Sequence, residues 1–156
     1  MATWITIEVG DLNQYQAAKL ILAARTKALA ASQPDPFLEV MPDVINQMRG
    51  DIRGCPRNKI SATALTVPPG LRGAAVLLTI EAMQARLPGI TITEDLRTLI
   101  DDAKSRIKRI SKCEIPIEQP DDPLDPDDVQ RAGSIEMGTA KRSADRVTTR
   151  GQFGGL

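Results

Sequence analysis

The sequence contains no histidine among its 156 residues, and this absence excludes the most common enzyme chemistries. Histidine is the usual general base near neutral pH and the commonest metal ligand in proteins. Without it, one chain cannot assemble a Ser-His-Asp triad or a Cys-His pair. The two cysteines are too few for a zinc site. The sequence therefore predicts no catalytic residue, no metal ligand and no cofactor, and we expect a protein that is not an enzyme.

An excess of charge of either sign is also missing, because 20 basic residues balance 20 acidic ones. A dedicated nucleic-acid binder needs a basic excess, so that class is disfavoured, although local patches still matter. The apolar runs are far shorter than a membrane span. Residues Met1–Trp4 lack the basic region and apolar run that open a signal peptide. Aromatic residues make up only 3% of the chain, so we expect an aliphatic core of packed helices.

The two cysteines, Cys55 and Cys113, are far apart and form no Cys-x-x-Cys motif. Two cysteines do not make a disulfide scaffold. The favoured interpretation is a pair of free thiols in a reducing cytoplasm, and a disulfide is the alternative. A nucleophilic Cys55 with Arg57 beside it is disfavoured, because no histidine is present to act as its base.

Apolar residues at three- and four-residue spacing predict helices at about 17–31, 42–53, 70–87 and 94–111. Asp11 is a candidate N-cap for the first of these helices. Pro42 suits the first turn of the second helix, where its missing N–H costs nothing. Phe37, Leu38 and Val40 are expected to form a short turn before it. The fold class predicted is mainly α, a small four-helix bundle with an extended C-terminal arm.

The helix at 70–87 is apolar on nearly all sides, which places it at the centre of the bundle. Its faces are interpreted as plain core and not as a ligand groove. Leu78 on this helix and Ile100 on the next are both expected to be buried. Two short β-prone pieces, at 4–9 and 64–67, lie outside the helices.

The helix at 94–111 ends in five cations, the basic cluster, which comprises Lys104, Arg106, Lys108, Arg109 and Lys112. Cations near a helix C-terminus are stabilising because they oppose the partial negative charge there. The simpler interpretation is therefore a solvated helix end. The alternative is a specific contact with an anion or DNA.

Composition changes sharply after Cys113 and divides the chain into a helical bundle at 1–113, a Pro/Asp-rich extended linker at 114–132 and an arm at 133–156. The arm has too few apolar residues to fold alone, so we expect it to become ordered on a partner. It carries residue types that anchor interfaces when a partner supplies a groove. These candidate partner-binding residues are Arg142, Arg146, Arg150, Phe153 and Leu156.

Several stretches follow one another in a characteristic order: Asp35-Pro36-Phe37 through Asp43-Val44-Ile45, Arg49-Gly50-Asp51-Ile52, Leu65-Thr66-Val67-Pro68-Pro69-Gly70-Leu71, Glu81-Ala82-Met83-Gln84-Ala85-Arg86-Leu87, Thr93-Glu94-Asp95, and Ile115-Pro116-Ile117-Glu118 leading into Pro120-Asp121-Asp122-Pro123. An extended X-Pro piece is followed by an apolar helix, a charged helix and a Pro-rich exit. In this order, residues 35–126 resemble tailed-phage head–tail connector, or adaptor, proteins of the helical-bundle type.

The resemblance implies a structural virion protein that joins the portal to the tail. About twelve copies would form a ring under the portal, with a tail-side neck protein as a further partner. Double-stranded DNA would pass through the central channel without specific contacts. The protein would lie in the virion neck after assembly in the host bacterial cytoplasm. The C-terminal arm would grip the portal, and a subunit or portal contact would involve Lys104, Lys108, Arg109 and Lys112.

Two other functions are open on the sequence. One is a different neck or head-completion protein, such as a stopper or tail-terminator ring, which is usually rich in β-structure. The other is a small helical DNA-binding regulator that uses the basic cluster. The regulator is disfavoured because the chain has zero net charge and lacks a convincing helix-turn-helix.

Overall fold

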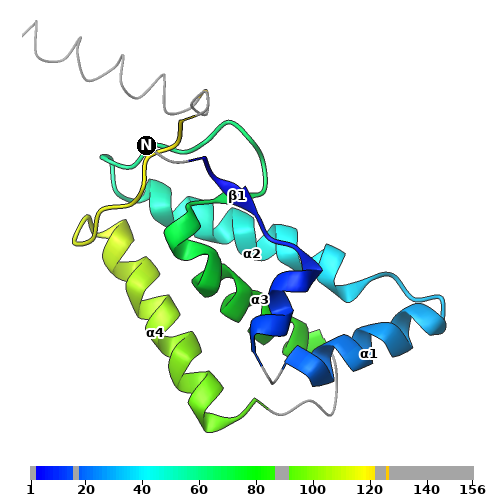
Figure 1. The fold of residues 1–156 in the computed structure, drawn as a ribbon. Helices are drawn as coiled ribbons and strands as arrows, with labels where there is room; N and C mark the ends of the chain where they lie inside the picture. Colours follow the sequence, from blue (N-terminus) through cyan, green and yellow to red (C-terminus); the bar gives the residue numbers. More distant parts are fainter. Residues whose placement is uncertain (1–2, 16–17, 87–91, 122–125, 127–156) are drawn as a thin grey trace, which may run out of the picture.

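The helices expected from the apolar spacing are present, with one large change at the start of the second. The computed structural model describes residues 3–15, 18–86, 92–121 and 126, and this part of the chain is mainly helical (Figure 1). Its α-helices are α1 Ala18–Ala30, α2 Pro36–Arg53, α3 Arg72–Arg86 and α4 Glu94–Ser111. The mainly α fold class is therefore confirmed. The predicted arm at 133–156 lies outside the described residues.

Helix α2 begins at Pro36, and the prediction that it starts at Pro42 is wrong. The side chain of Asp35 caps the helix by accepting a hydrogen bond from the N–H of Phe37 at 3.0 Å. Pro42 then lies inside the helix, at a cost of about 3 kcal/mol. Burial of Phe37 and Val40 contributes about 1.5–3 kcal/mol each and offsets that cost. The expected turn is therefore helical because Phe37 and Val40 enter the core, whereas Leu38 stays exposed.

Asp11 lies within a 3₁₀ helix, η1 at Val9–Gln14, and is not the N-cap of α1. Its carboxylate accepts a hydrogen bond from the N–H of Glu8 at 3.1 Å and pairs with Arg72 at the start of α3. The N-cap prediction is wrong because a residue distant in sequence fixes Asp11 in a separate turn. Local spacing carries no sign of such a partner.

The two β-prone pieces pair with each other, as β1 Ile5–Thr6 and β2 Thr66–Val67. They are antiparallel, and Ile5 lies opposite Val67. A second 3₁₀ helix, η2 at Pro69–Leu71, leads from β2 into α3. This small sheet brings the N-terminal segment against the segment that precedes the central helix (Figure 1).

Helix α3 is the centre of the bundle, as its apolar composition predicts, and packs against α1, α2, α4 and η1. Its buried side chains surround the helix axis and comprise Ala74, Ala75, Val76, Leu77, Thr79, Ile80 and Met83. Helix α4 contributes one stripe, Leu96, Ile100, Ala103, Ile107 and Ile110. Ile100 is buried as predicted, whereas Leu78 is half-buried and Leu99 is 46% exposed.

The two cysteines are joined in a disulfide between Cys55, just after α2, and Cys113, just after α4. The favoured expectation of free thiols is therefore wrong for this structure. Sequence distance misled it, because the packing of α2 and α4 brings the C-terminal ends of both helices together. Their Cα atoms are 5.2 Å apart although 58 positions separate them.

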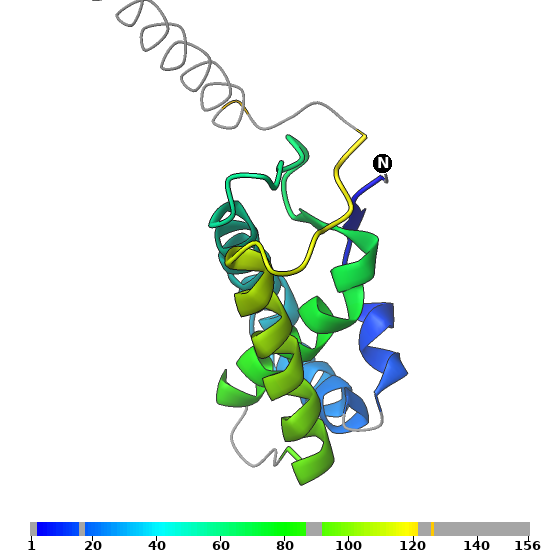
Figure 2. The ribbon, with the colours of Figure 1, turned by 90° about the vertical axis from the view of Figure 1, so that its left-hand side faces the viewer.

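Residues 114–120, here called the strap, run from the end of α4 across to the N-terminal segment (Figure 2). The indole N–H of Trp4 donates to the carbonyl of Glu118 at 3.1 Å. Ile115 and Ile117 pack against the core. The strap is extended, as expected of its prolines, but it belongs to the folded unit, which therefore continues beyond residue 113. Pro126, the one described residue after Asp121, adopts a helical conformation, contrary to the extended run expected there.

Candidate functional site

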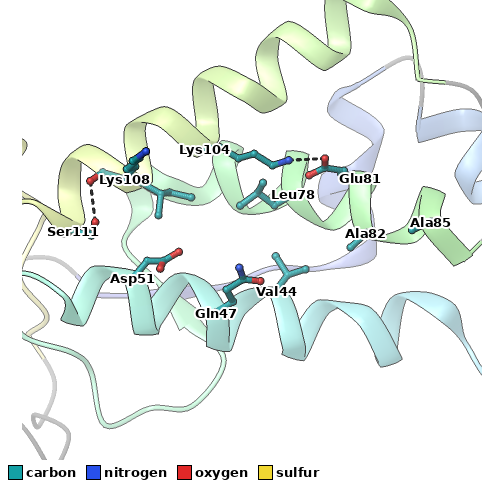
Figure 3. A pocket seen from close by; sticks show the side chains of 11 residues that line it. Val44, Gln47, Asp51, Leu78, Glu81, Ala82, Ala85, Lys104, Lys108 and Ser111 are labelled. Atoms are coloured by element: carbon teal, nitrogen blue, oxygen red, sulfur yellow. Dashed lines mark hydrogen bonds and ion pairs between the residues drawn. The ribbon is translucent and has the colours of Figure 1, made fainter.

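A groove of about 660 Å³ opens between α2, α3 and α4 (Figure 3). Its floor is apolar and is formed by Val44, Leu78, Ala82, Ala85 and Ile107. Polar side chains surround the floor, namely Gln47, Asp51, Glu81, Lys104, Lys108 and Ser111. We call this feature the α2–α3–α4 groove. It is a concave surface with an apolar base and charged edges, the type that receives a segment of another protein.

The groove lies along one face of α3 that becomes more exposed toward the C-terminal end of the helix. Leu78, Ala82 and Ala85 follow one another at helical spacing. Near the start of α3 the same face is buried, but Ala82 is half-buried and Ala85 is exposed. Alanine side chains are too short to fill the space between α2 and α4. The interpretation of this face as plain core is therefore wrong for its C-terminal half.

The charged edges of the groove come from facing helices. The Nζ atom of Lys104 lies 2.6 Å from Oε1 of Glu81, and both side chains are more than a third exposed. Such an exposed pair contributes about 0–1 kcal/mol. Across the groove from Lys108 lies Asp51 on α2 (Figure 3). Among the described residues, no ion pair engages Lys108.

The basic cluster does not form one surface, because its side chains lie on different sides of α4. Lys104 and Lys108 edge the groove. Arg106 lines a cavity of about 120 Å³ beneath the strap. Nε of Arg109 lies 3.3 Å from Oε2 of Glu114. Lys112 is the exposed C-cap. The structure thus brings two of the four candidate contact residues to the groove and leaves Arg109 and Lys112 at the helix end.

The candidate residues of the arm receive no placement. They lie outside the described residues and comprise Arg142, Arg146, Arg150, Phe153 and Leu156. Their assignment as partner contacts stays a prediction.

Arg49 on α2 is a residue that the sequence reasoning missed. Its guanidinium donates hydrogen bonds to the carbonyls of Ser61 at 2.6 Å, Thr63 at 3.0 Å and Thr66 at 2.9 Å. It also lies 5.6 Å from the ring centroid of Trp4. One arginine thereby fixes the loop between α2 and β2. The signal was its spacing, because Arg49 lies four residues after a buried isoleucine and three before another.

Two carboxylates outside the groove have altered acidity. Hydrogen bonds from the Arg25 side chain lower the pKa of Asp35 against the opposing effect of partial burial. At Asp11 burial acts to raise the pKa, but hydrogen bonds from Arg72 and from the Glu8 N–H, with the charge of Arg72, lower it overall. Both carboxylates are held charged by an arginine and stabilise the fold. Neither lies in a cavity with the groove residues.

In the described part of the chain, no group of three or more acidic, histidine or cysteine side chains lies close enough to hold a metal ion. Within the same residues, no helix has both the length and the apolar character needed to cross a bilayer.

No family model, no curated protein and no solved structure matches this chain. No function can therefore be carried over from a relative.

Proposed function

We propose that this protein is a structural assembly subunit, a head–tail connector of a tailed phage that forms a ring with copies of itself beneath the portal. The observation that carries the proposal is the α2–α3–α4 groove. A ring of identical copies needs one patch on each copy that receives a different patch of the next. A half-apolar groove with charged edges supplies the receiving patch.

The occupant we propose is the acidic segment of a neighbouring copy, and charge complementarity supports it. Residues 121–128, which follow the strap, contain no base and five acids, Asp121, Asp122, Asp125, Asp127 and Asp128. Residues 104–112 of α4 contain five cations and no acid. Lys108 is exposed and lies at the groove without an ion pair to the described residues. A segment of opposite charge from the next copy would meet it there.

The mainly helical fold supports a connector over the stopper and tail-terminator rings, which are usually rich in β-structure. It does not by itself separate a connector from a helical DNA-binding regulator. Two of the five cations in the basic cluster are paired with acids of the same chain, which weakens the case for a DNA contact. A mobility shift at physiological salt distinguishes the two.

The test fills the groove without disturbing the core. Ala85 lines the groove and is exposed, so Ala85→Arg should fold normally and block the floor. Ser105→Arg is the matched control, because Ser105 is exposed on α4 and does not line the groove. Native mass spectrometry of the full chain should show rings for the wild type and the control, and monomers for Ala85→Arg. Rings of Ala85→Arg as stable as those of the wild type would refute the groove as the interface.

A further inference from the structure

The Cys55–Cys113 disulfide lies at the point where the strap leaves the bundle. Helices α2 and α4 already meet here without it. A Cβ added to Gly54 would lie 3.3 Å from the Cβ of Ser111 on α4. The two helix ends therefore lie close together, one residue before Cys55 and two residues before Cys113. Their packing brings the two sulfur atoms within bonding distance.

Cys113 occupies a backbone position that glycine usually holds. Its φ is 62°, in the left-handed region, and the N–H of Glu114 donates to the carbonyl of Arg109 at 2.9 Å. This is the hydrogen bond of a Schellman motif, whose left-handed residue is most often glycine. A side chain there is unfavourable for the backbone. A cysteine at such a position points to a role for its sulfur.

Beyond Cys113 the strap is held by a few separate hydrogen bonds. The carbonyl of Glu118 accepts from the Trp4 indole, and its carboxylate accepts from the N–H of Gly70 at 3.1 Å. The side chain of Gln119 accepts from the N–H of Lys59 at 3.0 Å. Single hydrogen bonds at a surface contribute little net stability, because water replaces them readily. Ile115 and Ile117 also pack against the core. The disulfide adds a covalent attachment at the residue from which the strap begins.

We propose that Cys55 and Cys113 form a reversible redox site that fixes the strap when oxidised and releases it when reduced. The reactant is a small disulfide of the glutathione type. Two thiols of the chain lose two protons and two electrons to it, the Cys55–Cys113 bond forms, and two molecules of the small thiol leave. In the reverse reaction a small thiolate attacks Sγ of Cys113, which is partly exposed, and Cys55, which is 1% exposed, leaves as the thiolate and takes up a proton. A second small thiolate then attacks the small-molecule sulfur of the mixed disulfide, which releases Cys113 as the thiol and forms the small disulfide.

The two states correspond to two surroundings, and this step alone rests on the proposed function. A virion protein is made in a reducing cytoplasm, where the thiols persist, and meets oxidising conditions after the virion is released. Oxidation would then fix the position at which the chain continues beyond the strap. The redox behaviour of the strap itself depends only on the described residues.

The experiment measures strap attachment and thiol state together in the full chain. The protein is equilibrated in glutathione buffers of increasing oxidised fraction, and free thiols are counted by alkylation and mass spectrometry. Amide exchange is followed by NMR at the Trp4 indole, Gly70 and Lys59, with Ile80 in α3 as the reference. Trp4 is the one tryptophan, so its indole signal needs no further assignment.

Reduction should lower protection at the three strap-bonded groups by at least about tenfold, in step with the thiol count, and leave Ile80 protected. Cys55→Ala/Cys113→Ala should show the released state in every buffer. Gln119→Ala should lose protection at Lys59 alone in the oxidised state.

Unchanged protection at Trp4 and Gly70 in the fully reduced protein would overturn the proposal. Loss of protection at Ile80 on reduction would overturn it equally, because the bond would then hold the whole bundle together. If the double alanine variant fails to fold, the reduced wild type gives the same decision. A failure here leaves the groove and the connector proposal standing, since ring formation by Ala85→Arg is measured separately.

Discussion

The strap region, which comprises the strap with the disulfide, Trp4 and Arg49, differs from the α2–α3–α4 groove in how its side chains are used. In the strap region, Arg49 and Trp4 engage backbone carbonyls of distant segments, and a disulfide joins two helix ends. At the groove, alanines leave the helices apart and charged side chains edge an open floor. In the first region, the hydrogen bonds and the disulfide join parts of the same chain. The second keeps apolar and charged surface accessible to another molecule.

Amino-acid substitutions should therefore have different consequences in the two regions. Changes in the strap region should alter folding, because the groups there are partners of one another. Changes in the groove should alter association and leave folding nearly intact.

The largest difference in stability is expected between substitutions at a buried apolar position of α4 and at a solvent-accessible apolar position of α3. Ile100→Asp places an unpaired charge where the side chain is 2% exposed, and should cost more than about 4 kcal/mol. Leu78→Asp places the same charge in the groove, where solvent reaches it, and should cost roughly 1–2 kcal/mol. Urea unfolding followed by circular dichroism measures both. Equal losses would mean that the groove is closed in solution.

The next contrast compares two cations. Arg49→Met removes the donor to three loop carbonyls and should cost roughly 2–4 kcal/mol. Lys104→Met removes an exposed pair with Glu81 and should cost about 0–1 kcal/mol. Thermal unfolding of the two variants gives the comparison. A loss for Lys104→Met as large as that for Arg49→Met would contradict the division between the two regions.

A smaller effect is expected on the stability of the protein at low pH. The pKa of Asp11 is lowered in the folded protein from its usual value of 3.8. Its stabilising contribution is therefore complete above 3.8 and is lost as the pH falls through the lowered folded value. Asp11→Asn should remove that part of the acid dependence, worth about 1 kcal/mol, because Arg72 is 46% exposed. Arg72→Met should reduce it similarly in urea titrations between pH 7 and pH 2. An undiminished acid dependence in both variants would rule out the pair as its source.

The smallest effect on stability is expected from removal of the C-terminal arm. Truncation after Gln130 leaves the bundle, the disulfide and the strap in place, so helix content and the thermal midpoint should not change. We expect the truncated protein to lose its attachment to portal-bearing heads, which sedimentation with purified heads would measure. Attachment with full-length affinity would place the portal contact on the bundle itself.

The sequence predicted those elements whose cause is local. The apolar stripe of α4 gave its bounds and its buried Ile100, because helical spacing fixes which residues share a face. Thr93 caps this helix locally, and its side chain accepts a hydrogen bond from the N–H of Leu96. The start of α2 was missed because burial of Phe37 overrides the preference of Pro42 for a first turn.

The candidate site was foreseen only in part. The basic cluster drew attention to Lys104 and Lys108 because five cations without an acid stand out in any sequence. The groove beside them was interpreted as core, because alanine occurs at the same spacing in a packed helix interface and in an open groove. The distinction depends on how far α2 and α4 stand from α3 at Ala82 and Ala85.

The sequence by itself determined a mainly helical chain with α3 at its centre, because apolar periodicity and composition act along one segment at a time. Tertiary structure alone decided the pairing of Cys55 with Cys113, the ion pair of Asp11 with Arg72 and the clamp formed by Arg49. Each of these interactions joins residues that are distant in sequence, and neither the spacing nor the composition of the sequence predicts which helix ends meet. The packing of α2 and α4 against α3 brings those partners within bonding distance.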